Sequence, residues 1–246
     1  MNMKKKITAI LAALSVGIIP TFAEINYDIR FGINAGATSP MPFPVEVRSI
    51  NSYTLTFQPA VEAGARYNFT DRTGIRSALV FEIKDMLASA DVKNYKMAIT
   101  GDDGSRMSGY WTGSDETNIR NVMLSIPLEF AYTPSAKFMI HAGPYVSFLI
   151  TRRFSGKVYD GYLRKGEPTG DRISYYDGAY SDYDFSDNVR NCQFGISAAA
   201  DYNIGNWLLV SLGLKWGLTN IFESSFETIS FKMYPIYANL SLGYRF

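Results

Sequence analysis

The sequence predicts an all-β fold: an eight-stranded antiparallel transmembrane up-and-down β-barrel with long extracellular loops and short periplasmic turns. Three observations predict it. Apolar and polar residues alternate with a period of two in eight segments, as they do in a strand with one apolar and one polar face. The connections between the segments alternate between about four residues and much longer stretches, which is the layout of outer-membrane barrels. An export signal precedes the first segment.

The export signal covers residues 1–23. Lys4, Lys5 and Lys6 form a positive start, residues 7–19 form an apolar run, and residues 21–23 form a small-x-small cleavage site. The run is shorter than the ~20 residues that a membrane-spanning helix needs. We therefore expect a signal peptide followed by a barrel domain of residues 24–246 in the outer membrane of a Gram-negative cell envelope.

Composition excludes several other classes of protein. Without the signal peptide the chain has 21 basic and 23 acidic residues, a net charge of −2, so it lacks the basic patch of a nucleic-acid-binding protein. Its one cysteine, Cys192, excludes an internal disulfide framework, and we expect it to face lipid. Aromatic residues make up 15% of the chain, and such side chains gather where one end is wet and the other dry, as at a membrane interface.

Each strand is predicted from its alternation, which is clearest in the last one. There Ile236, Leu240 and Phe246 lie on one face, and Asn239, Ser241 and Arg245 lie on the other. The predicted strands are residues 27–37, 55–69, 74–84, 118–132, 137–152, 192–203, 207–217 and 235–246. The predicted long loops are residues 38–54, 85–117, 153–190 and 218–229. Pro59, Pro127 and Pro144 fall within strands, and each predicts a bulge or a position near the edge of a strand, because proline has no N–H to donate.

The apolar face carries no charge and is expected to meet lipid, which leaves the polar face inside. The charged residues of that face are Asp28, Glu62, Glu82, Glu129, Asp201, Arg30, Arg66, Arg76, Lys84, Lys137, Lys215 and Arg245. Side chains fill the interior of an eight-stranded barrel. We therefore expect an occluded lumen of ion pairs and no open pore.

No catalytic, cofactor-binding or metal-binding residue is predicted. The only histidine, His141, is expected opposite or diagonal to Glu129 across a hairpin, either as an acid–base pair or, preferably, as one more ion pair of the lumen. One His and one Cys do not make a His-rich metal site or a Cys–His nucleophile pair. The aspartates at 182, 184 and 187 are followed by Gln193 where a calcium loop has Glu. The sequence therefore does not predict an enzyme.

The segment 153–190 is rich in tyrosine. Tyr159, Tyr162, Tyr175, Tyr176, Tyr180, Tyr183 and Phe185 lie among glycines and aspartates, a mixture typical of adaptable contact surfaces. The segment is either a loop that binds an extracellular ligand or envelope partner, or strands beyond the membrane whose aromatic residues pack on each other. The other expected contacts are outer-membrane lipid and lipopolysaccharide, and the barrel-assembly machinery at the C-terminal strand. The expected state is a monomer.

Several short motifs in the second half resemble the PorT-like outer-membrane β-barrel family of Bacteroidota. They are residues 126–129 with Tyr132, residues 142–145, Gly195-Ile196 with Asp201-Tyr202, residues 217–221 and the ending 242–246. The resemblance implies a porin-family outer-membrane barrel with periplasmic ends, and its named member works in a protein-secretion system linked to gliding. Three functions thus stay open: a structural or interaction barrel acting through its loops, a component of a secretion or envelope assembly, and a narrow small-solute channel.

Overall fold

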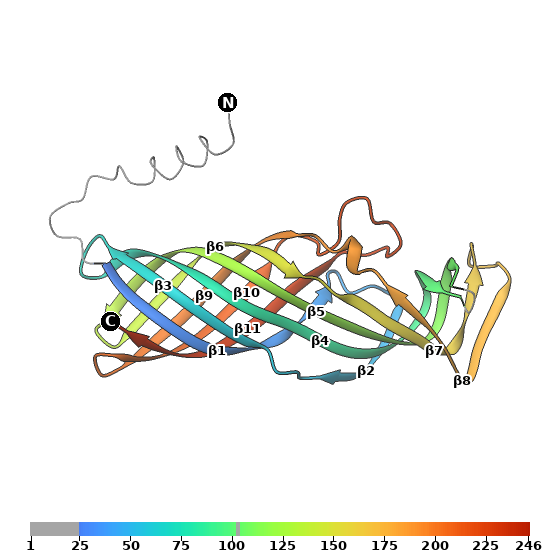
Figure 1. The fold of residues 1–246 in the computed structure, drawn as a ribbon, viewed down its shortest axis with the longest axis horizontal. Coiled ribbons are helices and arrows are strands. Elements are labelled where there is room, and N and C mark those ends of the chain that lie inside the picture. The colour runs from blue at the N-terminus through green and yellow to red at the C-terminus, as the bar shows by residue number, and fades with distance from the viewer. Residues whose placement is uncertain (1–24, 102–103) are drawn as a thin grey trace, which may run out of the picture.

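The computed structural model describes residues 25–101 and 104–246, so the predicted signal peptide lies outside the described residues. Eleven strands and one short 3-10 helix, η1, form the fold (Figure 1). Their bounds are β1 Ile25–Pro40, β2 Val47–Thr54, β3 Pro59–Asn68, β4 Thr73–Thr100, β5 Arg106–Ser135, β6 Phe138–Thr151, β7 Phe154–Lys165, β8 Arg172–Asp184, η1 Ser186–Asn188, β9 Cys192–Ile204, β10 Leu208–Gly217 and β11 Met233–Arg245. None of the described helical segments is long and apolar enough to cross a membrane.

Eight strands close into a ring, which confirms the predicted barrel. The order around the ring is β1-β3-β4-β5-β6-β9-β10-β11, and β11 pairs with β1. Every pairing is antiparallel. Turns of a few residues join β3 to β4, β5 to β6 and β9 to β10, at the same end of the barrel as the C-terminus (Figure 1).

The barrel wall continues far beyond the ring on one side, where the sequence predicted loops. β4 and β5 pair in one register from Thr73–Tyr132 to Val92–Gly113, and again after one bulge up to Thr100–Arg106. The predicted loop 85–117 is therefore wrong: it is a hairpin of two long strands. The predicted loop 153–190 is wrong in the same way, because β7 pairs with the outer half of β5, and β8 pairs with β7.

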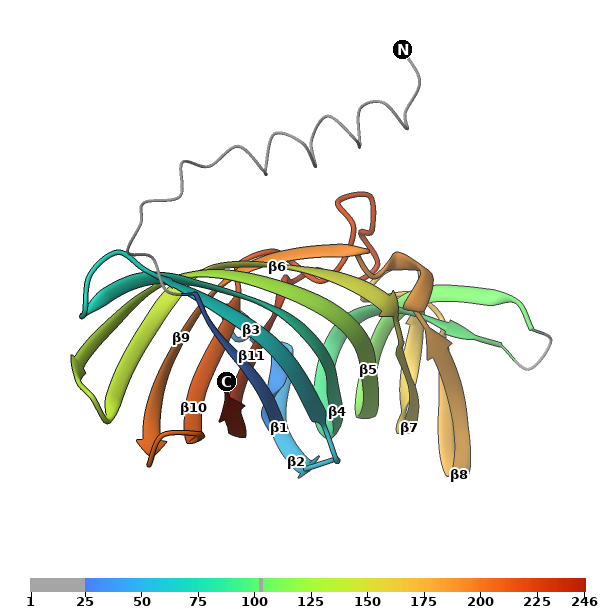
Figure 2. The ribbon, with the colours of Figure 1, turned by 60° about the vertical axis from the view of Figure 1, so that its left-hand side comes forward.

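The predicted loop 38–54 also contains strand, since β1 runs to Pro40 and β2 pairs with the outer part of β4. By contrast, the predicted strand 55–69 starts only at Pro59. The connection before β11 is irregular, as predicted. We call the sheet formed by β2, β7, β8 and the outer halves of β4 and β5 the extension; it curves away from the closed ring (Figure 2).

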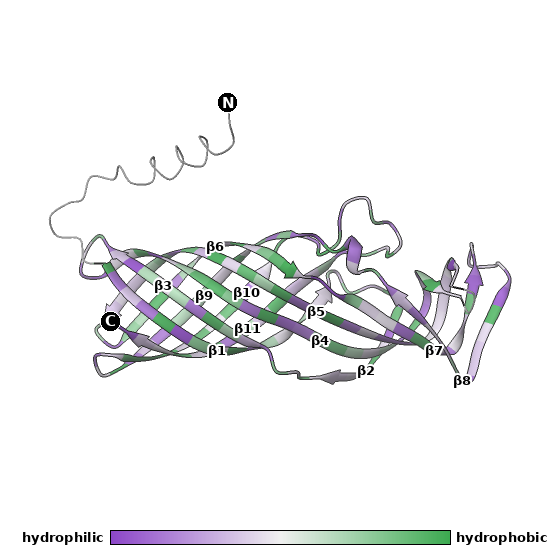
Figure 3. Ribbon diagram, viewed as in Figure 1, coloured by the Kyte–Doolittle hydropathy of each residue, from purple (hydrophilic) through white to green (hydrophobic). Residues whose placement is uncertain are grey.

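The outward face of the ring is apolar, as predicted, and Figure 3 shows hydrophobic and hydrophilic residues alternating along its strands. Phe31, Leu128 and Leu242 are all more than half exposed on this face, although a soluble protein rarely exposes a continuous apolar band. The band ends at the Asp85–Arg120 pair of β4 and β5 (3.9 Å), where the outward face becomes charged. The extension therefore lies beyond the hydrocarbon layer.

The three strand prolines do not produce bulges. Pro59 is the first residue of β3. Pro127 of β5 pairs with Tyr145, and Pro144 of β6 pairs with Ile196, with no shift of register at either position. The prediction of a bulge or a position near a strand edge is therefore confirmed for Pro59 and wrong for Pro127 and Pro144, where the proline only removes a ladder hydrogen bond. The shifts between β5 and β6 lie elsewhere, at Val122/Met123 and Tyr132/Ser135.

Candidate functional site: a filled lumen beneath an apolar mouth

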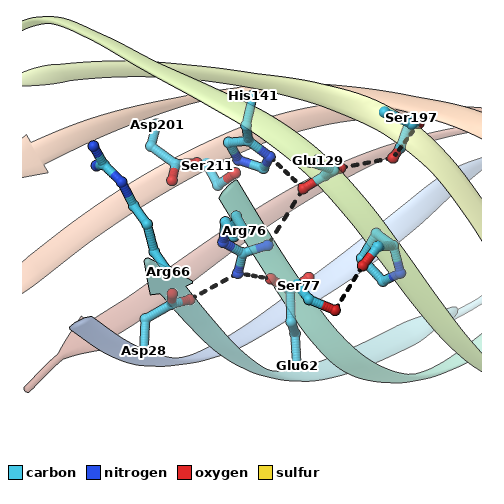
Figure 4. A network of polar contacts seen from close by, with 12 residues as sticks. Asp28, Glu62, Arg66, Arg76, Ser77, Glu129, His141, Ser197, Asp201 and Ser211 are labelled. Carbon is cyan, nitrogen blue, oxygen red and sulfur yellow. Dashed lines mark hydrogen bonds and ion pairs between the residues drawn. The ribbon is translucent and has the colours of Figure 1, made fainter. Parts of the chain in front are cut away.

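Charged residues of seven ring strands form a network in the lumen, and Figure 4 shows the part of it around Arg76. Arg76 of β4, only 1% exposed, lies at its centre. Its guanidinium contacts Glu62, lies 3.0 Å from Asp28 Oδ1 and lies 3.5 Å from Glu129 Oε2. A Cβ at Gly64 would lie 2.8 Å from Asp28 Oδ2, so the glycine leaves room for this arrangement.

A second guanidinium joins the network to β9. Arg30 of β1 contacts Asp28 and places Nη2 2.9 Å from Asp201 Oδ2. Its Nη1 is 2.9 Å from Asp201 Oδ1 and 3.2 Å from Ser211 Oγ. Both oxygens of the Asp201 carboxylate are thus bound by the two nitrogens of one guanidinium, a geometry that is typical of strong ion pairs. Because Arg30 is on β1 and Asp201 is on β9, this pair links two strands that are not neighbours in the ring.

Further charged side chains of the lumen surround Glu82 of β4, which is fully buried. Lys215 Nζ lies 2.9 Å and Lys84 Nζ 3.5 Å from its Oε1, and Ser125 Oγ donates to the same oxygen at 2.7 Å. The Lys84 ammonium also lies 5.5 Å from the ring centroids of Tyr145 and Tyr237, within the range of a cation–π contact.

His141 lies between two carboxylates, as the ion-pair hypothesis predicted. Its Nδ1 is 2.6 Å from Glu129 Oε2, and its Nε2 is 3.3 Å from Asp201 Oδ1. Both ring nitrogens face acceptors, and only the imidazolium donates from both. With His141 charged, the network balances five bases against five acids: Arg30, Arg76, Lys84, Lys215 and His141 against Asp28, Glu62, Glu82, Glu129 and Asp201.

All five predicted lumen acids belong to the network, but three of the seven predicted bases do not. Lys137 is exposed in the turn between β5 and β6, so its prediction as a lumen residue is wrong. Arg66 donates to the sulfur of Met139 (2.9 Å), and Arg245 donates to Asn203 (2.7 Å), both near the short turns. Within the described ranges, no cluster of His, Cys, Asp and Glu is arranged to hold a metal ion.

The space left inside the charged network is small. One cavity of about 40 Å³ touches Arg30, Arg76, Glu129, His141 and Lys215. A single water occupies about 30 Å³ of liquid, so this cavity has room for one or two waters.

An apolar cluster occupies the mouth above the lumen, on the inner face of the extension. Its members include Trp111, Ile119, Phe154, Val158 and Leu163, on β5 and β7. The connection between β10 and β11 lies against them: Phe222 packs on Phe154 with ring centroids 4.8 Å apart. Arg190 holds this connection in place, because its Nε donates to the carbonyl of Phe222 (2.7 Å).

The tyrosine-rich segment divides between this cluster and the surface. Tyr175, Tyr183 and Phe185 are buried in the cluster, whereas Tyr176 and Tyr180 are exposed on β8. The hypothesis of strands beyond the membrane with packed aromatic residues therefore describes the buried half. The exposed half is the surface that the partner-binding hypothesis needs.

Sequence reasoning missed the buried acid Asp115 of β5. Its side chain lies in the apolar mouth at 7% exposure, and it accepts a hydrogen bond from Thr117 Oγ1 (2.9 Å). Burial raises the pKa of the Asp115 carboxyl to about 6, because a charge is poorly solvated in apolar surroundings. It also lines a cavity of about 250 Å³ with Met86, Tyr95 and Phe154. The sequence of the predicted loop 85–117 contains no pattern that indicates that Asp115 is buried.

Comparisons with known proteins agree with this architecture. The family model described as "Outer membrane protein beta-barrel domain" matches residues 19–223. A search of curated proteins gives no match.

Among solved structures, Ail of Yersinia pestis has 10% identity and a TM-score of 0.38, with 91% of this chain and 99% of that chain covered. OprG of Pseudomonas aeruginosa has 13% identity and a TM-score of 0.40, covering 90% and 95%. Neisserial surface protein A has 10% identity and a TM-score of 0.36, covering 91% and 97%. Such distant likenesses carry no information about function. The family match covers most of the chain, so the chain belongs to the outer membrane protein beta-barrel domain family and its location is the outer membrane.

Proposed function

We propose that the chain is a non-conducting outer-membrane barrel that acts as a structural or interaction protein through its extracellular extension, without catalysis. The single observation that carries this proposal is the balanced network of five bases and five acids, with space for only one or two waters between them. A conducting barrel needs a continuous water path, and the charged network interrupts one. Of the described chain, the extension projects farthest from the membrane. It carries the exposed side chains of Tyr176 and Tyr180.

The orientation of the barrel follows from the general layout of outer-membrane barrels, in which short turns face the periplasm and long connections face outward. By this layout, the C-terminus and the three short turns are periplasmic, and the extension is extracellular. Tyr176 and Tyr180, with 46% and 58% exposure, then lie on the extracellular surface, where a binding partner can contact them.

Planar-bilayer conductance of the refolded mature chain tests the proposal, with a heat-modifiability gel to confirm folding. We expect a folded protein that gives no reproducible channels. Discrete, steady openings would overturn the proposal and favour the narrow small-solute channel. In that case the charged network would act as a selectivity filter.

The resemblance to PorT-like barrels supports a second candidate, a component of a secretion or envelope assembly. The motif residues of β5 and β6 that carry the resemblance include Glu129, which serves the lumen network here. Such an assembly would contact the periplasmic turns, whereas the first proposal requires contacts at the extension. A photo-crosslinking residue at Tyr180 or at Asp71, placed in cells that make the protein naturally, separates the two. Adducts at Tyr180 alone support the interaction barrel, and adducts at Asp71 alone support the assembly.

A further inference from the structure

The extension contains an apolar cavity of about 250 Å³ between the end of β1, β2, β4 and the connection before β11. Its lining includes Phe43, Met86, Val92, Tyr95, Phe154 and Met233. A cavity of about 150 Å³ with such a lining stays dry and accepts benzene. The present cavity therefore suits a somewhat larger apolar body.

The cavity opens toward the segment between β1 and β3. Phe43, Ile50 and Tyr53 line it and are exposed by 54%, 61% and 40%. β3 begins only at Pro59, so the wall between β1 and β4 above this level is formed by residues 41–58 rather than by a ring strand. A small molecule can reach the cavity from this side.

One charged group lies in this apolar lining, the carboxyl of Asp115. Its Oδ1 is buried and has no hydrogen-bond partner among the described residues, whereas its Oδ2 accepts from Thr117. The groups that lie near it are the Tyr95 and Tyr183 phenols. None of these brings a positive charge.

The other buried acids of the described chain show that this is unusual for the molecule. Asp28, Glu82, Asp85, Glu129 and Asp201 are each within 4.0 Å of a basic nitrogen. Among the described residues, Asp115 is the one buried acid that has no basic nitrogen within 4.0 Å. A buried carboxylate is normally paired, because desolvation of a lone charge is strongly unfavourable.

We propose that this cavity binds a small apolar molecule carrying one amino group, whose ammonium pairs with Asp115. The inference rests on the proposed function and names the ligand class that the extension takes. The apolar body fills the space beside Phe154 and Tyr95, and the ammonium donates to Oδ1 of Asp115. An arylalkylamine of about ten heavy atoms matches the cavity, judged by the size of cavity that benzene fills.

Other ligand chemistries fit less well. An apolar carboxylate would face the negative charge of Asp115, and an apolar alcohol would leave the Asp115 carboxylate without a counter-charge. A primary ammonium comes either from a free amine or from an ethanolamine lipid headgroup, and the experiment below distinguishes these sources.

The test compares three ligands of nearly equal size by isothermal titration calorimetry on the folded full-length mature chain in detergent. They are 2-phenylethylamine, 2-phenylethanol and 3-phenylpropanoate, each also titrated into protein-free micelles. We expect the amine to bind about ten- to a hundredfold more tightly than the alcohol, as a hydrogen bond to a charged group predicts, and the propanoate to bind most weakly. Equal affinities for amine and alcohol, or no saturable binding of the amine, would overturn the proposal.

Matched variants locate the site. Asp115→Asn is expected to remove the preference for the amine and keep binding of the alcohol. Asp91→Asn, on the outward side of β4, is expected to change neither. If Asp115→Asn does not fold, Ala88→Leu, which adds side-chain volume to the cavity lining and keeps Asp115, is expected to abolish binding of both ligands. Retention of the amine preference in Asp115→Asn, or of full binding in Ala88→Leu, would refute the assignment.

Competition by lysophosphatidylethanolamine identifies the source of the ammonium. Displacement of 2-phenylethylamine by the lipid supports a headgroup, and the absence of displacement supports a free amine. Channel openings by the same preparation would refute the proposed function and leave the binding result standing. The two proposals can therefore fail separately.

Discussion

Replacing Asp115 with asparagine is expected to stabilise the ligand-free protein at neutral pH, although it removes a charge from a cavity of the extension. Asparagine keeps the acceptor for Thr117 Oγ1 and nearly the same shape. The perturbation therefore isolates the effect of ionising a carboxyl in apolar surroundings.

The magnitude follows from the raised pKa of Asp115. Its value of about 6 in the folded protein lies about 2 above the ordinary value of 3.8. The folded state thus holds a proton that the unfolded state has lost between pH ~4 and ~6, and stability falls as the pH rises through this window. Each pH unit corresponds to about 1.4 kcal/mol, so the wild type is expected to lose about 3 kcal/mol above pH ~6 relative to pH below ~4.

The assay is urea unfolding at pH 8 and at pH 4, with Trp111 as the reporter. Trp111 is fully buried in the mouth, whereas Trp207 and Trp216 are exposed on the barrel wall. Both of these are replaced by phenylalanine in the background, so the fluorescence follows the extension alone.

Asp115→Asn should exceed the wild type by about 3 kcal/mol in unfolding free energy at pH 8 and by less than about 1 kcal/mol at pH 4. The other acids titrate alike in both proteins and cancel in the difference. Equal stabilities at pH 8, or a gain of the same size at both pH values, would refute the reasoning, because the effect would then not come from ionisation.

Two further predictions concern the lumen and the mouth. Arg76→Met is expected to destabilise the barrel by about 3–5 kcal/mol in urea unfolding, because Asp28, Glu62 and Glu129 lose a shared counter-charge. Arg72→Met, in an exposed turn, is the control. A change in unfolding free energy below about 0.5 kcal/mol for Arg76→Met would show that Arg76 does not stabilise the lumen network. Trp111→Ala is expected to destabilise the extension by about 3–5 kcal/mol, seen as faster amide hydrogen exchange in the outer halves of β4 and β5. Exchange in β9 and β10 should not change, and a uniform increase would mean that the extension and the ring unfold as one unit.

The ring was predictable because the two faces of its strands meet two different environments. Lipid outside and ion pairs inside force strict alternation, so β11 reads as Leu240 and Leu242 outward and Asn239 and Ser241 inward. The antiparallel register across the short turn between β5 and β6 then places His141 beside Glu129, as the sequence alone indicated.

The extension was not predictable by the same rule, because its outer face meets water rather than lipid. In the outer half of β4, Ala88 and Ala90 face the mouth while Ser89 and Asp91 face outward. Alanine and serine differ little in polarity, so the alternation fades although the strand continues.

The buried position of Asp115 depends on contacts that lie far apart in the sequence. Tyr183 of β8 comes to lie beside it, linked through Thr117 Oγ1 (2.8 Å from the Tyr183 hydroxyl), only because β7 pairs with β5 and β8 pairs with β7. The local alternation of residues does not indicate which distant strands pair.

The filled lumen is tested most directly by the reactivity of a cysteine placed inside it. Ser125 is fully buried and bonds to Ser147 Oγ at 2.6 Å, and Cys192 is the natural cysteine to be replaced by alanine. In the folded Cys192→Ala protein, Ser125→Cys should not react with a small cationic methanethiosulfonate, whereas Ser49→Cys, on the exposed surface of β2, should react completely. Labelling of Ser125→Cys at a rate similar to Ser49→Cys would mean that water and ions pass through the lumen, and it would contradict the central claim of a plugged barrel.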